Sequence, residues 1–156
     1  MKNTLIILAL IFIGLLTIPF SCKYFEQPQR YYKSHSDELY SGGWVPKIFP
    51  NDISEIHEQH DIDTNEVWLS FNRGNKDIDP EKINMSRLTW DHIQSIKFRK
   101  PFFSRWWFEG PVQQQPANDN ALNTDFFKGS CVMEGMTSYL ALDRTSQRSY
   151  WWCQWD

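Results

Sequence analysis

The residues best suited to chemistry lie close together between positions 57 and 63. Two imidazoles, His57 and His60, stand among three carboxylates, Glu58, Asp61 and Asp63. Imidazole nitrogens and carboxylate oxygens are ligands that zinc and similar cations accept in proteins. The residue types alone therefore make His57, His60, Asp61 and Asp63 candidate metal ligands, and a metal-dependent hydrolase is the function that they would serve.

The spacing of these residues does not match a known catalytic motif. H-E-x-x-H places its two histidines one helical turn apart, whereas His60 follows His57 by three positions. On a strand, the two imidazoles would point to opposite faces. The following D-I-D-T-N resembles the start of a calcium loop, but Glu66 stands where that loop needs glycine. We therefore favour the interpretation that these polar side chains shape a turn, with the metal site as the alternative.

Other catalytic classes lack their motifs in this chain. The sequence contains no G-x-S-x-G and no phosphate-binding glycine loop, and Cys131 has no neighbouring histidine. Lys and Arg total 16 against 19 for Asp and Glu, without a block of like charge, so the sequence does not indicate binding of nucleic acid. We predict no cofactor and favour a non-catalytic role, while enzymatic activity stays open.

Aromatic side chains are the other candidates for contact with a ligand. Aromatic residues make up 16% of the chain, and tryptophan occurs eight times. Rigid rings give a large contact area at a small cost in conformational entropy. Neighbouring residues on a strand point to opposite faces, so we expect one ring of each adjacent pair in the core and one exposed. The candidate ligand platform for a glycan or a partner protein is Trp106, Trp107, Trp151, Trp152 and Trp155.

These groups must be positioned by a chain that begins with an apolar run. Residues 4–20 carry no charge, and as a helix they rise about 26 Å, close to the thickness of a bilayer core. We assign residues 1–22 to an N-terminal transmembrane helix that serves as membrane anchor or signal segment. The partner that we expect for this region is the membrane itself, through residues 4–20.

The end of the apolar run leaves two questions open. Cys22 would be lipidated in a lipoprotein, but Pro19 stands where the lipobox needs an aliphatic residue. Basic residues on both sides of the run leave the orientation ambiguous. We choose a single-pass protein of the bacterial inner membrane with its domain on the exported side, periplasmic or extracellular, because a short basic start before a long apolar stretch is typical of an export signal. A lipoprotein is the alternative.

We expect a juxtamembrane linker at residues 23–43 and one α+β domain at residues 44–156. The linker would hold one or two helical turns around residues 31–40, ended by Gly42 and Gly43. In the domain, residues 54–60 and 66–71 would pair as a hairpin, with a helix that continues through residues 57–60 as the alternative. Residues 138–143 and 148–155 would pair as another hairpin. Asp79-Pro80 would start the first of two short helices. Residues 113–124 would form a solvent loop.

The fold class that follows is α+β, an antiparallel sheet of roughly four to six strands with one or two short helices. Cys131 and Cys153 are our candidate disulfide, which would tie the segment before the last hairpin to its final strand. Two buried free thiols are the alternative. An oxidising compartment suits the disulfide and agrees with the exported side.

Several segments together carry a family resemblance. They are W-V-P at 44–46, the run from Ile56 to Phe71 with its I-x-E-x-H-D-x-D-T-N-x-x-W-x-x-F pattern, Trp106-Trp107, and the closing Y-L-A-L-D and Y-W-W. This combination resembles a group of small, uncharacterised, membrane-anchored bacterial proteins. The resemblance covers most of the chain from Trp44 onward and implies an envelope protein, without implying catalysis.

The function that we expect is a membrane-tethered envelope protein that binds a partner protein or a cell-wall component. The metal-dependent hydrolase that uses His57, His60 and Asp61 is one alternative. A small lipoprotein with an immunity or stress role is the other.

Overall fold

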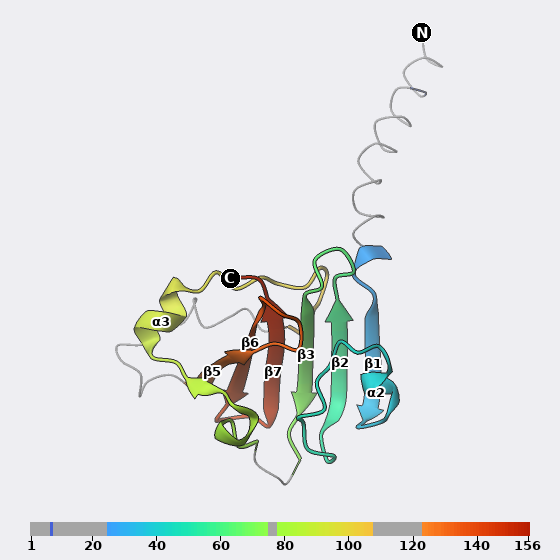
Figure 1. Ribbon diagram of the computed structural model, residues 1–156. Helices are drawn as coiled ribbons and strands as arrows, with labels where there is room; N and C mark the ends of the chain where they lie inside the picture. Colours follow the sequence, from blue (N-terminus) through green and yellow to red (C-terminus); the bar gives the residue numbers. More distant parts are fainter. Residues whose placement is uncertain (1–6, 8–24, 75–77, 108–122) are drawn as a thin grey trace.

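The computed structural model of the protein describes residues 7, 25–74, 78–107 and 123–156. One antiparallel sheet of seven strands dominates it, in the order β1-β2-β3-β7-β6-β5-β4 (Figure 1). The strands are β1 (Gln29–Ser34), β2 (Ser54–His60), β3 (Val67–Asn72), β4 (Ser86–Arg87), β5 (Thr124–Ser130), β6 (Thr137–Asp143) and β7 (Arg148–Gln154). The helical elements are α2 (Glu38–Ser41), η1 (Glu81–Ile83) and α3 (Trp90–Ser95). The described residues are therefore mostly β, with the expected antiparallel sheet and short helices. The sheet has seven strands rather than four to six, because β1 and the short β4 add an edge strand on each side.

Both predicted hairpins are present. β2 pairs with β3, and β6 pairs with β7 through the turn at residues 144–147. Asp143 holds this turn, because its carboxylate accepts hydrogen bonds from the backbone amides of Thr145 and Ser146 at 2.7 and 3.1 Å. The helical start at Asp79-Pro80 is also present, as the short η1, and α3 supplies the second short helix.

The linker prediction was wrong for residues 29–34. These residues form the edge strand β1, which pairs with β2 in the register Tyr31↔His57 and Tyr32↔Ile56. All side chains of β1 except that of Tyr32 are exposed, so the strand has no alternating apolar pattern from which to predict it. Backbone pairing with β2 places it in the sheet instead. The helical part of the prediction holds only for α2, which Gly42 and Gly43 follow.

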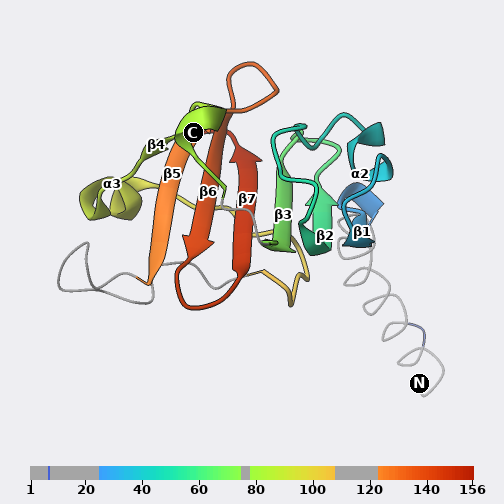
Figure 2. The ribbon, with the colours of Figure 1, turned by 90° about the horizontal axis from the view of Figure 1, so that it is seen from below.

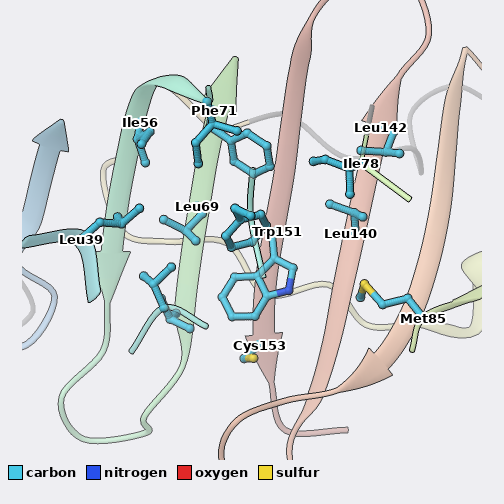
Figure 3. Close-up of a cluster of buried hydrophobic side chains, with 14 of the residues drawn as sticks. Leu39, Ile56, Leu69, Phe71, Ile78, Met85, Leu140, Leu142, Trp151 and Cys153 are labelled. Carbon is cyan, nitrogen blue, oxygen red and sulfur yellow. The ribbon is translucent and has the colours of Figure 1, made fainter. Parts of the chain in front are cut away.

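The sheet buries apolar side chains on both of its faces. Strand alternation divides them into a first core around Leu69, Leu140 and Trp151, and a second core around Trp68 and Trp152. Figure 3 shows the first core, in which side chains from α2, the sheet and residues 78–85 converge. The second core is closed by α3 and by residues of the segment that follows it, which Figure 2 shows in yellow. Two covered faces explain why a single sheet can bury so many large rings.

The predicted disulfide is present between Cys131 and Cys153. Cys153 is fully buried in the first core on β7, and Cys131 precedes the turn that leads into β6. The bond therefore ties the β5–β6 connection to the last strand, as expected.

The predictions for the N-terminus lie almost entirely outside the described residues, because of the anchor at residues 4–20 only Ile7 is described and Cys22 is not. Most of the predicted solvent loop at residues 113–124 also lies outside them, and its last residue, Thr124, begins β5. Within the part of the chain that the structure describes, no helix is long and apolar enough to cross a membrane.

Candidate functional site

The histidine and carboxylate cluster is divided between the two faces of the sheet. His57 pairs with Ser70 and His60 pairs with Val67, and the odd spacing along β2 sends their rings to opposite sides. The ring of His57 stacks on Trp106 with centroids 5.6 Å apart. The ring of His60 stacks on Trp44 with centroids 4.6 Å apart. The two imidazoles therefore cannot coordinate the same metal ion.

His60 belongs to a buried polar pair. Its Nδ1 lies 2.6 Å from Oε1 of Glu58, and both side chains are at most 5% exposed. Oε2 of Glu58 has no hydrogen-bond partner among the described residues, although Nε of Arg30 lies 4.0 Å away. Nδ1 of His60 is therefore occupied by a structural contact with Glu58 and is not available to a metal ion.

Asp61 shapes the turn between β2 and β3. Its Oδ1 accepts hydrogen bonds from the backbone amides of Asp63 and Thr64, both at 3.0 Å. Its Oδ2 accepts a hydrogen bond from the side-chain amide of Gln27 at 2.6 Å. Both carboxylate oxygens are thus occupied, as expected for a turn-forming aspartate.

No group of three or more His, Cys, Asp or Glu side chains that could hold a metal ion occurs among the described residues. His57 also lies in an environment unfavourable to its charged form. Burial is the main cause that lowers its pKa, and the positive charge of Arg148 lowers it further. Of the four metal candidates, His57 and His60 lie on opposite faces of the sheet, and Asp61 and Asp63 share the turn after β2, where Asp61 accepts a hydrogen bond from the Asp63 amide.

The tryptophan platform is also divided. Trp151 and Trp152 point to opposite faces of β7, but both are buried, so the expectation that one of them is exposed was wrong. The reason is that loops and α3 cover both faces of the sheet. Trp106 and Trp107 pack half-buried against the second core and contact each other edge to face. Only Trp155 of the five is exposed, at 42%.

Trp155 borders a groove of about 390 Å³ at the end of the sheet where β7 finishes. One wall comes from the segment after α3, with Lys97 and Arg99, and the other from Lys128 on β5 and from residues 154–156. Figure 1 shows this juxtaposition, with the C-terminus beside the yellow segment that leaves α3. Segments far apart in the sequence therefore build one surface.

The indole of Trp155 is held in place from two sides. Its Nε1 donates a hydrogen bond to the backbone carbonyl of Thr64 at 2.8 Å. Its six-membered ring lies against Gly135, where an added Cβ would come within 3.0 Å of Cζ3. Gly135 also has a φ of +82°, which suits glycine. The exposed ring is thus preorganised rather than free to rotate.

Gln154 fixes the wall on the α3 side of the groove. Its side-chain oxygen accepts a hydrogen bond from the backbone amide of Arg99 at 3.1 Å, and its side-chain nitrogen donates to the carbonyl of Lys97 at 3.0 Å. Gln154 itself is buried. A single buried amide therefore ties the basic segment to the end of β7.

Asp156 fixes the other wall. It accepts hydrogen bonds from the hydroxyls of Tyr139 and Thr137 at 2.7 and 2.8 Å, and Nζ of Lys128 lies at 3.2 Å. Burial alone would raise the pKa of Asp156, but these three donors outweigh it and lower the pKa. Burial, together with the hydrogen bond to Asp156, raises the pKa of Tyr139, so the phenol stays protonated as the donor.

The groove is positively charged within an acidic chain. Lys97, Arg99 and Lys128 line it, and Asp156 is the only acidic residue among its lining residues. Arg99 is shared with the buried Glu66, whose Oε1 lies 2.8 Å from Nη1. Burial raises the pKa of Glu66 despite this neighbour. The arrangement can attract an anion and hold a flat apolar group.

Apart from Trp155, the residues of this groove were missed in the sequence. The run K-F-R-K at 97–100 is a local basic signal on a chain with a net charge of -3. Its significance depends on Lys128 and Trp155, which only the sheet brings beside it.

The comparisons with known proteins cover the other half of the domain. Residues 27–72, which contain β1, α2, β2 and β3, are similar to the YbbD head domain family. No curated protein and no solved structure matches the chain. The recognised similarity therefore ends before the strands that build the groove.

Proposed function

We propose that this chain is a non-catalytic binding module, tethered to the membrane of a bacterial envelope, that holds an envelope component in the groove beside Trp155. The single observation that carries the proposal is the groove itself. It joins an exposed, immobilised indole to three cationic side chains, and its walls are fixed by hydrogen bonds of Gln154 and Asp156. Preorganised aromatic and cationic groups are what a binding surface needs, because little entropy is lost when a ligand docks.

The tether is supported by the sequence. Residues 4–20 are uncharged and long enough to approach a bilayer core, and the resemblance to small membrane-anchored bacterial proteins points the same way. The Cys131–Cys153 disulfide supports an exported domain, since disulfides persist in oxidising compartments. A lipid on Cys22 would give the same attachment by another route.

Fractionation of cells that make the full-length chain tests the tether. We expect the protein in the membrane fraction, with the domain cleaved by protease added to spheroplasts but not to intact cells. A chain recovered entirely with the cytosol would refute the tether. A Cys22→Ala variant that remains in the membrane would favour the transmembrane helix over the lipoprotein.

Site-specific photo-crosslinking tests the binding role. A photoreactive residue in place of Ser95, exposed at the groove, should give adducts with an envelope component in intact cells. The matched control is the same residue in place of Lys33, exposed on the distant edge strand β1. Equal adducts at both positions, or none at Ser95, would contradict binding through the groove.

A further inference from the structure

We infer that the groove beside Trp155 binds a carboxylate-bearing polysaccharide, with the indole against a sugar ring and Lys97 and Lys128 against its carboxylates. The inference rests on the proposed binding function and specifies the class of ligand. Three observations carry it: the local charge, the fixed indole, and the way in which the backbone of the wall is already occupied.

The charge of the groove favours an anion. Lys97, Arg99, Lys128 and one aspartate line it, and the exposed Lys100 extends the basic segment beyond the groove. Lys97 has no ion pair among the described residues, whereas Lys128 is shared with Asp156. On a chain of net charge -3, this local excess of cationic over acidic side chains draws anionic ligands by Coulomb attraction.

The indole supplies the apolar half of the recognition. Trp155 is 42% exposed, and its orientation is set by Thr64 and Gly135 rather than by a ligand. A fixed aromatic face beside polar groups matches a sugar ring, which has an apolar face and a polar rim. Cation and indole together therefore fit an acidic sugar better than a simple inorganic anion.

The backbone of the wall disfavours an extended peptide. Strand addition requires a row of free backbone amides and carbonyls. In this wall the carbonyl of Lys97 and the amide of Arg99 already bond to the side chain of Gln154. The groove thus offers side chains for recognition, and a glycan can use side chains without adding a strand.

Calorimetric titration of the full-length protein in detergent micelles tests this inference with three probes of similar length. They are an oligogalacturonate, its methyl ester, and an oligoglutamate. We expect the oligogalacturonate to bind at least about tenfold more tightly than either of the others, since tenfold corresponds to one good contact. Equal binding of the methyl ester would show that the carboxylates of the ligand are not recognised. Equal binding of oligoglutamate would show that an acidic peptide serves as well as an acidic sugar. Either result, or no binding of the oligogalacturonate, overturns the inference.

Two variants then locate the site. Lys97→Gln with Lys128→Gln should weaken oligogalacturonate binding about tenfold, while Lys33→Gln with Lys82→Gln, which makes the same change in net charge at distant exposed positions, should weaken it less than about twofold. Trp155→Ala should also weaken binding about tenfold. Thermal unfolding of each variant shows whether it is folded, and the surface lysine pair keeps the test valid if Trp155→Ala is not. Equal effects of the two lysine pairs would refute the site.

The inference and the proposed function fail separately. Groove-specific adducts from Ser95 without affinity for the oligogalacturonate would leave a binding module with another ligand. Affinity for the oligogalacturonate that survives all groove variants would place the glycan elsewhere.

Discussion

The two halves of the sheet differ in what they bury. The half formed by β1, β2 and β3 encloses the buried residues with an acidic or imidazole side chain in the described chain, namely Glu58, His60, Asp61 and Glu66. The half formed by β5, β6 and β7 buries apolar side chains and uncharged polar ones. The similarity to the YbbD head domain family covers residues 27–72, which is the first of these halves.

The difference shows where each half obtains its precision. In the first half, buried polar groups must meet specific partners, such as Glu58 with His60 and Asp61 with Gln27. In the second half, packed aromatic rings and the disulfide hold the strands together. The polar contacts of this half lie at the end of β7, where they build the groove. The groove therefore depends mainly on the second half, although Glu66 and Thr64 of the first half bond to Arg99 and Trp155.

The largest expected effect is in the apolar half. Trp152 is fully buried in the second core and stacks on Tyr139. Trp152→Ala should lower the free energy of unfolding by about 3–5 kcal/mol, because it leaves a large cavity between the sheet and the segment after α3. Denaturant unfolding measures this. A loss under about 1 kcal/mol would mean that the second core is not the main source of stability in this half.

The disulfide should contribute somewhat less. Cys131→Ala with Cys153→Ala should lower the free energy of unfolding by about 3 kcal/mol, since the bond closes a loop with a sequence separation of 22. Wild-type protein in reductant serves as the matched comparison and should lose a similar amount. If neither changes the unfolding midpoint, packing alone holds the second half.

The polar half should respond to loss of one partner. His60→Ala leaves both oxygens of the buried Glu58 carboxylate without a described hydrogen bond, which should cost about 2 kcal/mol. The double variant Glu58→Leu, His60→Leu should be more stable than His60→Ala, because no polar group is then stranded. A double variant that is less stable than His60→Ala would show that the Glu58–His60 pair adds to the free energy of unfolding beyond the hydrogen bond that each side chain gives the other.

The smallest effect concerns acid stability. Hydrogen bonds from Arg144, and the charges of Arg144 and Arg87, lower the pKa of Asp125 below its ordinary 3.8. A carboxyl whose pKa is lowered in the fold stabilises it above the unfolded pKa, and this stability is lost as pH falls through the folded pKa. Asp125→Asn should therefore cost roughly 1 kcal/mol or less at pH 7, and less still near pH 3. Unfolding curves at both pH values check the sign. An equal loss at both would exclude a charge effect.

Prediction from the sequence succeeded where one segment contains the whole pattern. Apolar Val67, Leu69 and Phe71 recur at every second position, and D-I-D-T-N supplies the turn, so the β2–β3 hairpin could be predicted. The last hairpin and the Cys131–Cys153 bond are of the same kind. β1 could not be predicted, because its exposed side chains carry no alternation and only its backbone joins the sheet.

The candidate site shows the other limit. Alternation correctly sent Trp151 and Trp152 to opposite faces, but their burial on both faces depended on loops and α3, which come from other parts of the chain. Trp155 was among the candidates, whereas Lys97, Lys128 and Gln154 were not.

The sequence by itself determined the strands with local alternation, their connecting turns, the candidate disulfide and an uncharged N-terminal run, because hydrophobic period and turn chemistry are properties of neighbouring residues. Only the tertiary structure decided that four of the five candidate tryptophans are packed against a core, and that Lys97, Lys128 and Trp155 meet in one groove. The physical reason is that sheet register and the covering of both faces depend on pairings between distant segments, and those pairings set which side chains reach solvent together.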